Sequence, residues 1–348
     1  MPVIPVGVLG ATGMVGQQFI ALLANHPWFR LEWLGASQRS EGKAYRDAAA
    51  WRLPSPLPDD IAARTVEAAT PGRAPRLVFS GLDSAVAGEI ETAFAAAGHI
   101  IVSNSRNHRM EPTVPLLIPE VNADHLALLD AQGAAYGWKG RIVTNPNCAV
   151  VVMAMALAPL RQFGLRTTMI TTLQAISGAG YPGVASWDIL ANVIPHIGGG
   201  EEEKVETEAK KILGSLDSGS VTLHPVIVSA TTTRVPVHDG HTGSISVGLQ
   251  QQPSPDAIID AWRSFTGRPQ TLELPSAPAQ PIVYLTEANR PQPSLDVHRG
   301  GGMTVSIGRL RACPVLDYKF IALGHNTIRG AAGAAILNAE LMHSEGLL

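Results

Sequence analysis

Cys148 has the sequence surroundings of a reactive thiol. It follows the polar turn Thr-Asn-Pro-Asn at residues 144–147 and precedes the apolar run 149–157, so we expect it on a tight turn where a helix begins. The backbone amides and the dipole at a helix start favour a thiolate over a thiol. The sequence therefore indicates that Cys148 is a nucleophile rather than a residue that fills a core.

A catalytic thiol needs an imidazole partner, and residues 234–242 offer two. This segment contains Arg234, His238 and His241. A turn alone would not need three basic side chains within nine residues. Either histidine alone would more often be structural. In a chain that also contains Cys148, the pair favours a functional role.

Several other polar side chains need either a ligand or a structural partner. Gln174 lies in the apolar strand expected at residues 169–176, so it either satisfies local backbone groups or points into a site. Arg109 ends the polar loop 104–109, where it either holds an anion or is solvated. The glutamates at 201–203 open a helix expected to continue to residue 213, and their charges suit its N-terminal dipole.

The elements that position these residues begin with a glycine-rich turn. Residues 10–16 read Gly-Ala-Thr-Gly-Met-Val-Gly, between an apolar strand at 3–9 and a helix at 17–24. The glycine spacing lets backbone amides approach a pyrophosphate and packs the helix close to the strand. The alternative is an ordinary turn between a strand and a helix, but the position after the first strand favours a dinucleotide site.

The next strand indicates which dinucleotide is bound. Residues 31–36 are followed by Ser37, Gln38, Arg39 and Ser40, without the acidic residue that would hold the ribose of NAD. A guanidinium and hydroxyl groups suit a 2′-phosphate, so we expect NADP, with a solvated surface arginine as the alternative.

Alternating strands and helices continue as far as residue 103 and predict a doubly wound parallel sheet of the Rossmann type. The length of 348 residues favours two domains. For the second we expect an α+β fold with a mostly antiparallel sheet, a proline-rich linker at 250–300, and strands at 169–176, 226–230, 244–249, 303–307 and 320–323. A last helix, 327–342, is expected to be capped by Asn326 and to return to the nucleotide domain. The predicted division is 1–147 with 326–348 for NADP binding, and 148–325 for catalysis and dimerisation.

Composition excludes several classes of function. Charged residues make up 16% of the chain and the net charge is −3, so no basic surface suggests nucleic acid. Two cysteines are too few for a disulfide framework or a cysteine zinc site, and we expect no metal. No apolar run is long enough for a membrane span and no basic leader precedes the glycine motif, so we expect a cytoplasmic protein with small-molecule partners.

Taken together, the motifs resemble the aspartate-β-semialdehyde dehydrogenase family, particularly its archaeal and fungal branch. The resemblance runs from end to end of the chain. Beyond the glycine motif it rests on residues 107–109, 119–125, 145–148, 174–180, 201–204, 234–242 and 325–330.

The resemblance implies NADP-dependent, reversible reductive dephosphorylation of β-aspartyl phosphate to aspartate β-semialdehyde, through a cysteine thioester, in the biosynthesis of lysine, threonine and methionine. It implies that Cys148 is the nucleophile, His241 the acid and base, and Gln174 a partner that orients the thioester. The substrate residues it implies are Arg234 for the carboxylate, Glu201 or its neighbour Glu202 for the ammonium group, and Arg109 and Lys204 for phosphate. The implied cofactor residues are Gly10, Thr12, Gly13, Met14, Val15, Gly16, Ser37, Arg39, Ser40, Gly81, Asn104, Ser177, Gly178 and Asn326, and the implied assembly is a homodimer or homotetramer.

One departure and two rival functions remain. Ala149 follows the cysteine where relatives carry Ser or Thr, and a lost hydroxyl there can alter the coenzyme contact or the substrate. Malonyl-CoA and succinyl-CoA reductases are similar and use CoA in place of phosphate. A non-catalytic NADP-binding regulator would have no use for the thiol chemistry.

Overall fold

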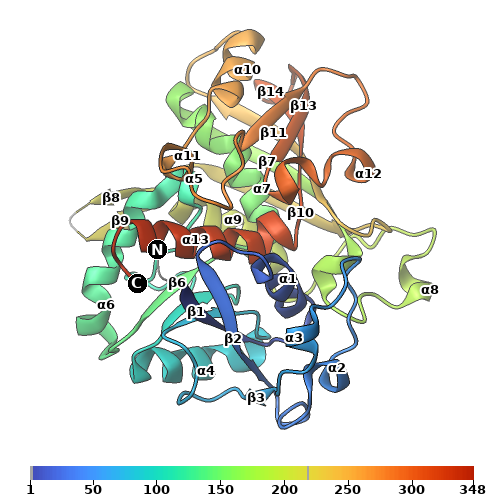
Figure 1. Ribbon diagram of the computed structural model, residues 1–348. Helices are drawn as coiled ribbons and strands as arrows, with labels where there is room; N and C mark the ends of the chain where they lie inside the picture. Colours follow the sequence, from blue (N-terminus) through green and yellow to red (C-terminus); the bar gives the residue numbers. More distant parts are fainter. Residues whose placement is uncertain (1–2, 218) are drawn as a thin grey trace.

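The computed structural model describes residues 3–217 and 219–348, and its two six-stranded sheets form the lower and upper halves of Figure 1. The first sheet is parallel throughout, in the order β3-β2-β1-β4-β5-β6. Its strands are β1 (Ile4–Leu9), β2 (Phe29–Ala36), β3 (Glu67–Ala68), β4 (Leu77–Ser80), β5 (Ile100–Ser103) and β6 (Arg141–Thr144). Its connecting helices are α1 (Met14–Leu23), α2 (Tyr45–Ala48), α3 (Asp59–Ala62), α4 (Ser84–Ala97), α5 (Pro119–Asn122) and α6 (Leu129–Tyr136).

The second sheet is mixed, in the order β10-β7-β11-β14-β13-β12. Neighbours β7–β11, β11–β14 and β14–β13 are antiparallel, whereas β10–β7 and β13–β12 are parallel. Its strands are β7 (Leu165–Gln174), β10 (Ile227–Arg234), β11 (His241–Leu249), β12 (Ile282–Leu285), β13 (Val305–Ala312) and β14 (Tyr318–Gly324). A separate hairpin pairs β8 (Ser215–Asp217) with β9 (Ser220–Thr222). The predicted fold class, a Rossmann-type sheet followed by a mostly antiparallel α+β domain, is confirmed.

The prediction of a linker at 250–300 is wrong. This segment holds α10 (Pro255–Arg263), α11 (Arg268–Thr271), α12 (Pro293–Asp296) and the edge strand β12. Each of these helices has a proline in its first turn, where the missing N–H costs nothing, so the prolines start helices instead of breaking them. Trp262 of α10 is fully buried and stacks on Tyr284 of β12, which anchors the segment in the core.

Two helices lie where the halves meet. Helix α7 (Cys148–Leu157) is buried from residue 149 onward, as its apolar sequence requires, and packs with the second sheet. Helix α9 (Glu201–Ile212) packs on both α7 and β10, and α8 (Ser186–Ile189) lies between β7 and α9 in the chain.

The last helix, α13 (Gly333–Ser344), crosses between the two halves in Figure 1 and shares a hydrophobic core with the first sheet. Asn326 does not cap it, contrary to expectation. The helical run starts with a π-helical turn, Ile328–Ala332, while the Asn326 amide accepts from the Gly240 N–H and donates to the Ser177 hydroxyl. The domain boundaries at 147 and 325 stay a prediction. Of the helices in the described ranges, none combines the length and the apolar character needed to span a membrane.

Candidate active site

Three predicted site residues lie side by side because they end or begin neighbouring strands. Gln174 ends β7 and pairs in register with Arg234, which ends the parallel strand β10. His241 begins β11, which runs antiparallel to β7 and pairs Thr242 with Leu173. Residues paired across two neighbouring strands have side chains on the same face of the sheet. Gln174 and Arg234 are both buried, so both point to the buried face.

The catalytic pair expected from the sequence is in contact. The Sγ atom of Cys148 lies 3.1 Å from Nε2 of His241. The N–H of Ala175 donates to Nδ1 of the same ring at 3.1 Å, so the neutral imidazole carries its proton on Nε2, facing the sulfur. Burial lowers the pKa of His241 to about 3, and the nearby Arg234 charge acts in the same direction. The ring is therefore a neutral N–H donor at physiological pH.

The expected thiolate at the helix start is not favoured in this ligand-free state. Burial raises the pKa of the Cys148 thiol to about 12, and the Glu201 carboxylate adds to the rise, which outweighs the opposing effect of Arg109 and Arg234. The Asn147 side chain caps the helix by accepting from the N–H groups of Ala149 and Val150. The Ala149 N–H also lowers the pKa of the thiol, but by less than burial raises it. The cysteine residue nevertheless keeps part of its surface exposed, which leaves it open to a substrate.

Glu201 is the polar centre of the site. Its Oε1 accepts from Nδ2 of Asn147 at 2.8 Å and from Nε2 of Gln174 at 3.2 Å, and its Oε2 pairs with the Lys204 ammonium at 3.0 Å. Burial alone would raise the pKa of Glu201, but the Asn147 hydrogen bond and the Lys204 charge hold it below its usual value. A negative charge is thus maintained close to the thiol.

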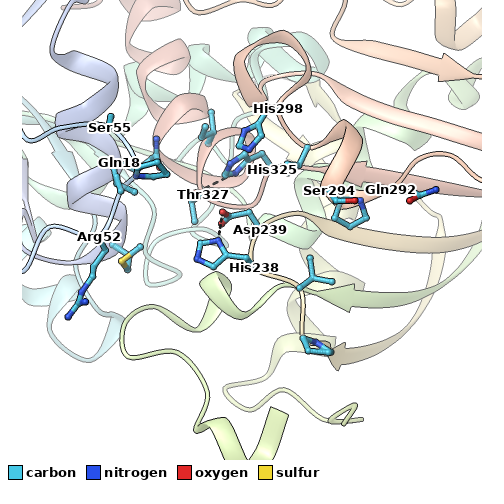
Figure 2. Close-up of a pocket in the computed structure, with 18 residues that line it drawn as sticks. Gln18, Arg52, Ser55, His238, Asp239, Gln292, Ser294, His298, His325 and Thr327 are labelled. Carbon is cyan, nitrogen blue, oxygen red and sulfur yellow. Dashed lines mark hydrogen bonds and ion pairs between the residues drawn. The ribbon is translucent and has the colours of Figure 1, made fainter. Parts of the chain in front are cut away.

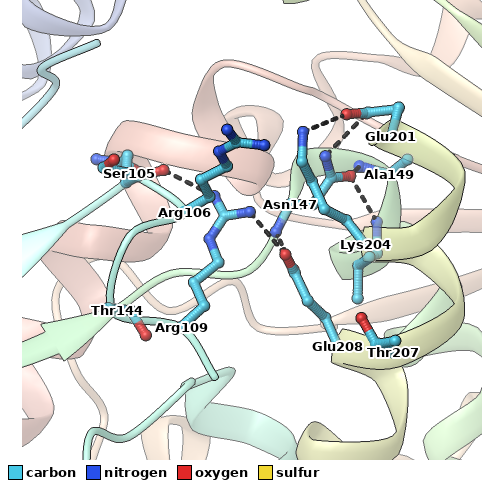
Figure 3. A network of polar contacts seen from close by, with 12 residues as sticks. Ser105, Arg106, Arg109, Thr144, Asn147, Ala149, Glu201, Lys204, Thr207 and Glu208 are labelled. Carbon is cyan, nitrogen blue, oxygen red and sulfur yellow. Dashed lines mark hydrogen bonds and ion pairs between the residues drawn. The ribbon is translucent and has the colours of Figure 1, made fainter. Parts of the chain in front are cut away.

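The choice between Glu201 and Glu202 follows from the sides of α9 on which they lie. Glu202 accepts from the backbone N–H of Thr232, on the edge strand β10. Glu201 points to Asn147 and Gln174 instead, as Figure 3 shows for Asn147. This arrangement favours Glu201 as the substrate contact.

Arg109 lies in the site but is already paired. Its Nη1 donates to Glu208 at 2.9 Å (Figure 3). Its Nη2 donates to the Asn104 carbonyl at 2.7 Å. The neighbouring Arg106, which the sequence did not single out, reaches across to the Gly199 carbonyl just before α9. The side chains that sequence reasoning missed are therefore Arg106, Asn147 and Glu208. Only Asn147 had a clear local signal, because it stands at the N-cap position before the apolar run.

Ala149 lines a small apolar gap beside His241. Its side chain is buried, and the other residues of the gap include Val152, Ile170 and His241. Burial of this kind around the imidazole lowers the pKa of His241.

The predicted dinucleotide turn has the geometry that its glycines suggest. Gly10 has φ = 72°, and a Cβ on Gly16 would lie 2.3 Å from the Gly10 carbonyl oxygen. The cap residue of α1, Gly13, makes no side-chain bond to the first turn, so amides there remain for an anion. The buried Tyr45 hydroxyl holds the loop by donating to the Ala11 carbonyl at 2.8 Å.

The remaining predicted cofactor residues surround this turn. A Cβ on Gly10 would lie 2.7 Å from the Gly81 carbonyl oxygen, which places the ends of β1 and β4 in contact. Ser37 and Arg39 are exposed after β2, while Ser40 is buried. Asn104 follows β5 and accepts from Asn145. A Cβ on Gly178 would lie 2.8 Å from Nη1 of Arg234, so the Ser177–Gly178 turn lies against the end of β10.

A cavity of about 810 Å³ opens beside these residues, between the two halves of the molecule (Figure 2). Met14 and Gln18 of α1 line one side, and His325 and Thr327, which flank Asn326, line another. His238 also lines this cavity, and its Nδ1 lies 2.6 Å from Oδ2 of Asp239. The histidine in contact with the thiol is His241 instead. The cavity continues the predicted cofactor cleft.

A Rossmann-type sheet with a cysteine and histidine in contact at its border with a second sheet defines a dinucleotide-dependent dehydrogenase that works through a covalent intermediate. Comparison with known proteins agrees with this class. The family model "Semialdehyde dehydrogenase, NAD binding domain" matches residues 5–129, and "Semialdehyde dehydrogenase, dimerisation domain" matches residues 157–329.

Individual relatives narrow the assignment. The chain is 49% identical to the aspartate-semialdehyde dehydrogenase of Cryptococcus neoformans, over 100% of this chain and 99% of that protein. It is 46% identical to the enzyme of the same name from Archaeoglobus fulgidus, over 99% of both chains. The crystal structure of Candida albicans aspartate-semialdehyde dehydrogenase with NADP superposes with a TM-score of 0.91, at 42% identity and full coverage of both chains. The chain belongs to the aspartate-semialdehyde dehydrogenase family.

Proposed function

We propose that this protein interconverts β-aspartyl phosphate and aspartate β-semialdehyde with NADP, and that in the cell it runs toward the semialdehyde, supplying lysine, threonine and methionine synthesis. The observation that carries the proposal is the 3.1 Å contact between Cys148 and His241 in a chain so similar to enzymes of that name. A cytoplasmic location is part of the proposal, supported by two cysteines that are both free.

Cys148 supplies the covalent step. In the oxidative direction its sulfur adds to the aldehyde carbon, while the thiol proton passes to the oxygen of the resulting thiohemiacetal, relayed by His241 as the acid and base. When the hydride leaves the carbon, this hydroxyl gives up its proton and its oxygen becomes the thioester carbonyl. His241 presents its Nε2–H to these reacting atoms, so it stabilises that oxygen by hydrogen bonding. Bound NADP supplies the acceptor for the hydride. The thioester left on Cys148 is then opened by phosphate, which releases the acyl phosphate and restores the sulfur.

The substrate is held through its two charged groups. The Arg234 guanidinium uses Nη1 on the Ala175 carbonyl at 2.7 Å, which fixes its plane and leaves other N–H groups for a carboxylate. Glu201, ionised and buried, is placed to accept from the substrate ammonium group. Gln174, which donates to Glu201, orients the acyl group on the neighbouring sulfur.

Phosphate binds between the loop of Arg109 and helix α9. Arg109 and Lys204 carry the charge that phosphate needs, and each is held by a carboxylate of α9, Glu208 and Glu201 respectively. The NADP pyrophosphate is bound by the amides at the start of α1, and Arg39 contacts the 2′-phosphate.

We expect NADPH to form from aspartate semialdehyde and NADP only when phosphate is added, because the thioester on Cys148 needs a second nucleophile. The measurement is the absorbance of NADPH with phosphate, with CoA, and with neither. Turnover that ignored phosphate but required CoA would favour an acyl-CoA reductase, and NADP binding without any turnover would favour a regulator. The same assay with NAD tests Arg39, since equal rates with NAD and NADP would contradict its role.

The assembly we propose is a homodimer formed by the outer face of the second sheet. Met169, Thr171 and Leu173 of β7, with Ile227 of β10, leave a row of exposed side chains there, and the matching family model is described as a dimerisation domain. An exposed sheet face that carries apolar side chains of this kind is buried when a second copy packs on it across a two-fold axis.

Met169→Glu is expected to weaken the dimer by roughly two orders of magnitude, because it buries an unpaired charge in the interface. Sedimentation velocity over a dilution series measures the change. Val315→Glu is the matched control, since Val315 is 78% exposed in the turn between β13 and β14 and should leave the dimer intact. A wild-type protein that stays monomeric at micromolar concentration would contradict the proposal.

A further inference from the structure

Helix α9 has more charged residues on its site-facing side than the reaction above uses. Glu201, Lys204, Glu208 and Lys211 are spaced three, four and three residues apart, which places them in one row along the helix. On a second side of the helix, Glu202 and Glu206 accept from backbone N–H groups of β10. On a third side, Val205 and Ala209 are buried in the core. The first two residues of the row contact the site directly, whereas Glu208 and Lys211 lie behind it.

Glu208 joins two parts of the site that are far apart in the sequence. The residue is 2% exposed. Its Oε1 accepts from Nη1 of Arg109 at 2.9 Å, and its Oε2 accepts from the backbone N–H of Asn147 at 2.7 Å (Figure 3). Asn147 is the residue before Cys148 and caps its helix. One carboxylate therefore sets the position of an arginine and of the turn that presents the nucleophile.

Lys211 fixes the same loop from one turn further along α9. It is 3% exposed, and its Nζ donates to the carbonyl oxygens of Arg109, Glu111 and Val114 at 2.8, 2.7 and 2.8 Å. An ammonium group has three N–H donors, so this residue is fully used in holding the loop. The loop cannot move relative to α9 without breaking these bonds.

We propose that Glu208 is a positioning residue that couples the phosphate-binding Arg109 to the Cys148 turn, with Lys211 anchoring the Arg109 loop. This inference rests on the proposed function for its assignment of phosphate to Arg109. A carboxylate is required because both partners are donors. A glutamine would place its NH₂ group against one of them.

Glu208→Gln is expected to raise the KM for phosphate about tenfold and to change the KM for semialdehyde by less than about twofold, because Arg109 loses its charged support. A second readout is the pH dependence of Cys148 alkylation by iodoacetamide. The charged or titratable groups that face this thiol are Glu201 on α9, Arg109 on its loop, Arg234 on β10 and His241 on β11. With Glu208 neutral, the Arg109 charge is no longer balanced, so alkylation should begin at lower pH.

Glu206→Gln is the matched control, because Glu206 lies on the same helix and accepts from the Ala230 N–H at 3.0 Å, away from the site. It should leave both KM values and the alkylation profile unchanged. Glu208→Asp, which keeps the charge on a shorter side chain, should restore part of the phosphate KM, and it carries the same test if the glutamine variant does not fold.

Equal rises in both KM values, or a lower melting temperature with an unchanged alkylation profile, would overturn the proposal and leave Glu208 a purely structural residue. Failure of the proposed function looks different. In that case the wild-type enzyme would be indifferent to phosphate, while the shift in alkylation would still report the link from Glu208 through Arg109 to the thiol.

Discussion

Replacing Cys148 with alanine is expected to lower the rate of NADPH formation by at least about four orders of magnitude, because the proposed thioester forms on this sulfur. The NADP dissociation constant should change by less than about twofold, since the predicted pyrophosphate site lies at the start of α1. Steady-state kinetics measures the first quantity and fluorescence titration with NADPH the second.

The protein contains its own control for this experiment. Cys313, the other cysteine, lies just after β13, and its sulfur is close to the Ser246 hydroxyl, outside the site. Cys313→Ala should therefore retain activity. In the wild type, a quench during turnover should leave the acyl group on the Cys148 peptide alone. Activity in Cys148→Ala, or an acylated Cys313 peptide, would contradict the assignment.

The sequence was sufficient for those parts of the site that have local signals. The glycine turn after β1 and the cysteine before an apolar helix are each recognisable within about ten residues. Gln174, Arg234 and His241 stood out by residue type, and the family resemblance supplied their roles and the choice of His241 over His238. Because β7, β10 and β11 are adjacent in register, these three residues meet in the fold. Their mutual contact could not have been deduced from spacing alone.

The errors have physical reasons. Proline in residues 250–300 suggested a linker, although it occupies first-turn positions of three helices. The helix-start argument for a Cys148 thiolate considered the dipole but not burial or the Glu201 charge, which raise the pKa of the thiol more than Arg109, Arg234 and the Ala149 N–H lower it. Glu208 had no signal beyond its spacing on α9, because its partner Arg109 lies 99 residues earlier in the chain.

The ion pairs within the site predict which side chain binds the substrate carboxylate. Arg109 pairs with Glu208, and Lys204 pairs with Glu201. Of the three cations Arg109, Lys204 and Arg234, only Arg234 has no carboxylate within ion-pairing distance in the described part of the chain. Burial lowers the pKa of Arg234, and the thiol and Glu201 oppose this shift. The carboxylate of the substrate would form the missing ion pair with Arg234. The ammonium group of the substrate would then donate to Glu201.

His241→Gln is expected to reduce kcat by about two to three orders of magnitude, because the N–H that stabilises the oxygen of the thiohemiacetal is lost or misplaced. The KM for semialdehyde should change by less than about twofold, since Arg234 and Glu201 hold the charged ends of the substrate. Steady-state kinetics at saturating NADP and phosphate separates the two effects.

The pH profile distinguishes a neutral donor from a titrating acid. Burial holds the pKa of His241 near 3. The Ala175 N–H donates to Nδ1, the ring nitrogen that would have to gain a proton to form an imidazolium. Wild-type kcat/KM should therefore show no ionisation of His241 between pH 5 and 8, the range in which an exposed histidine titrates. An acidic limb near pH 6.5 in the wild type that disappears in His241→Gln would mean that the ring gains a proton during catalysis, and that the Ala175 bond breaks when substrate binds.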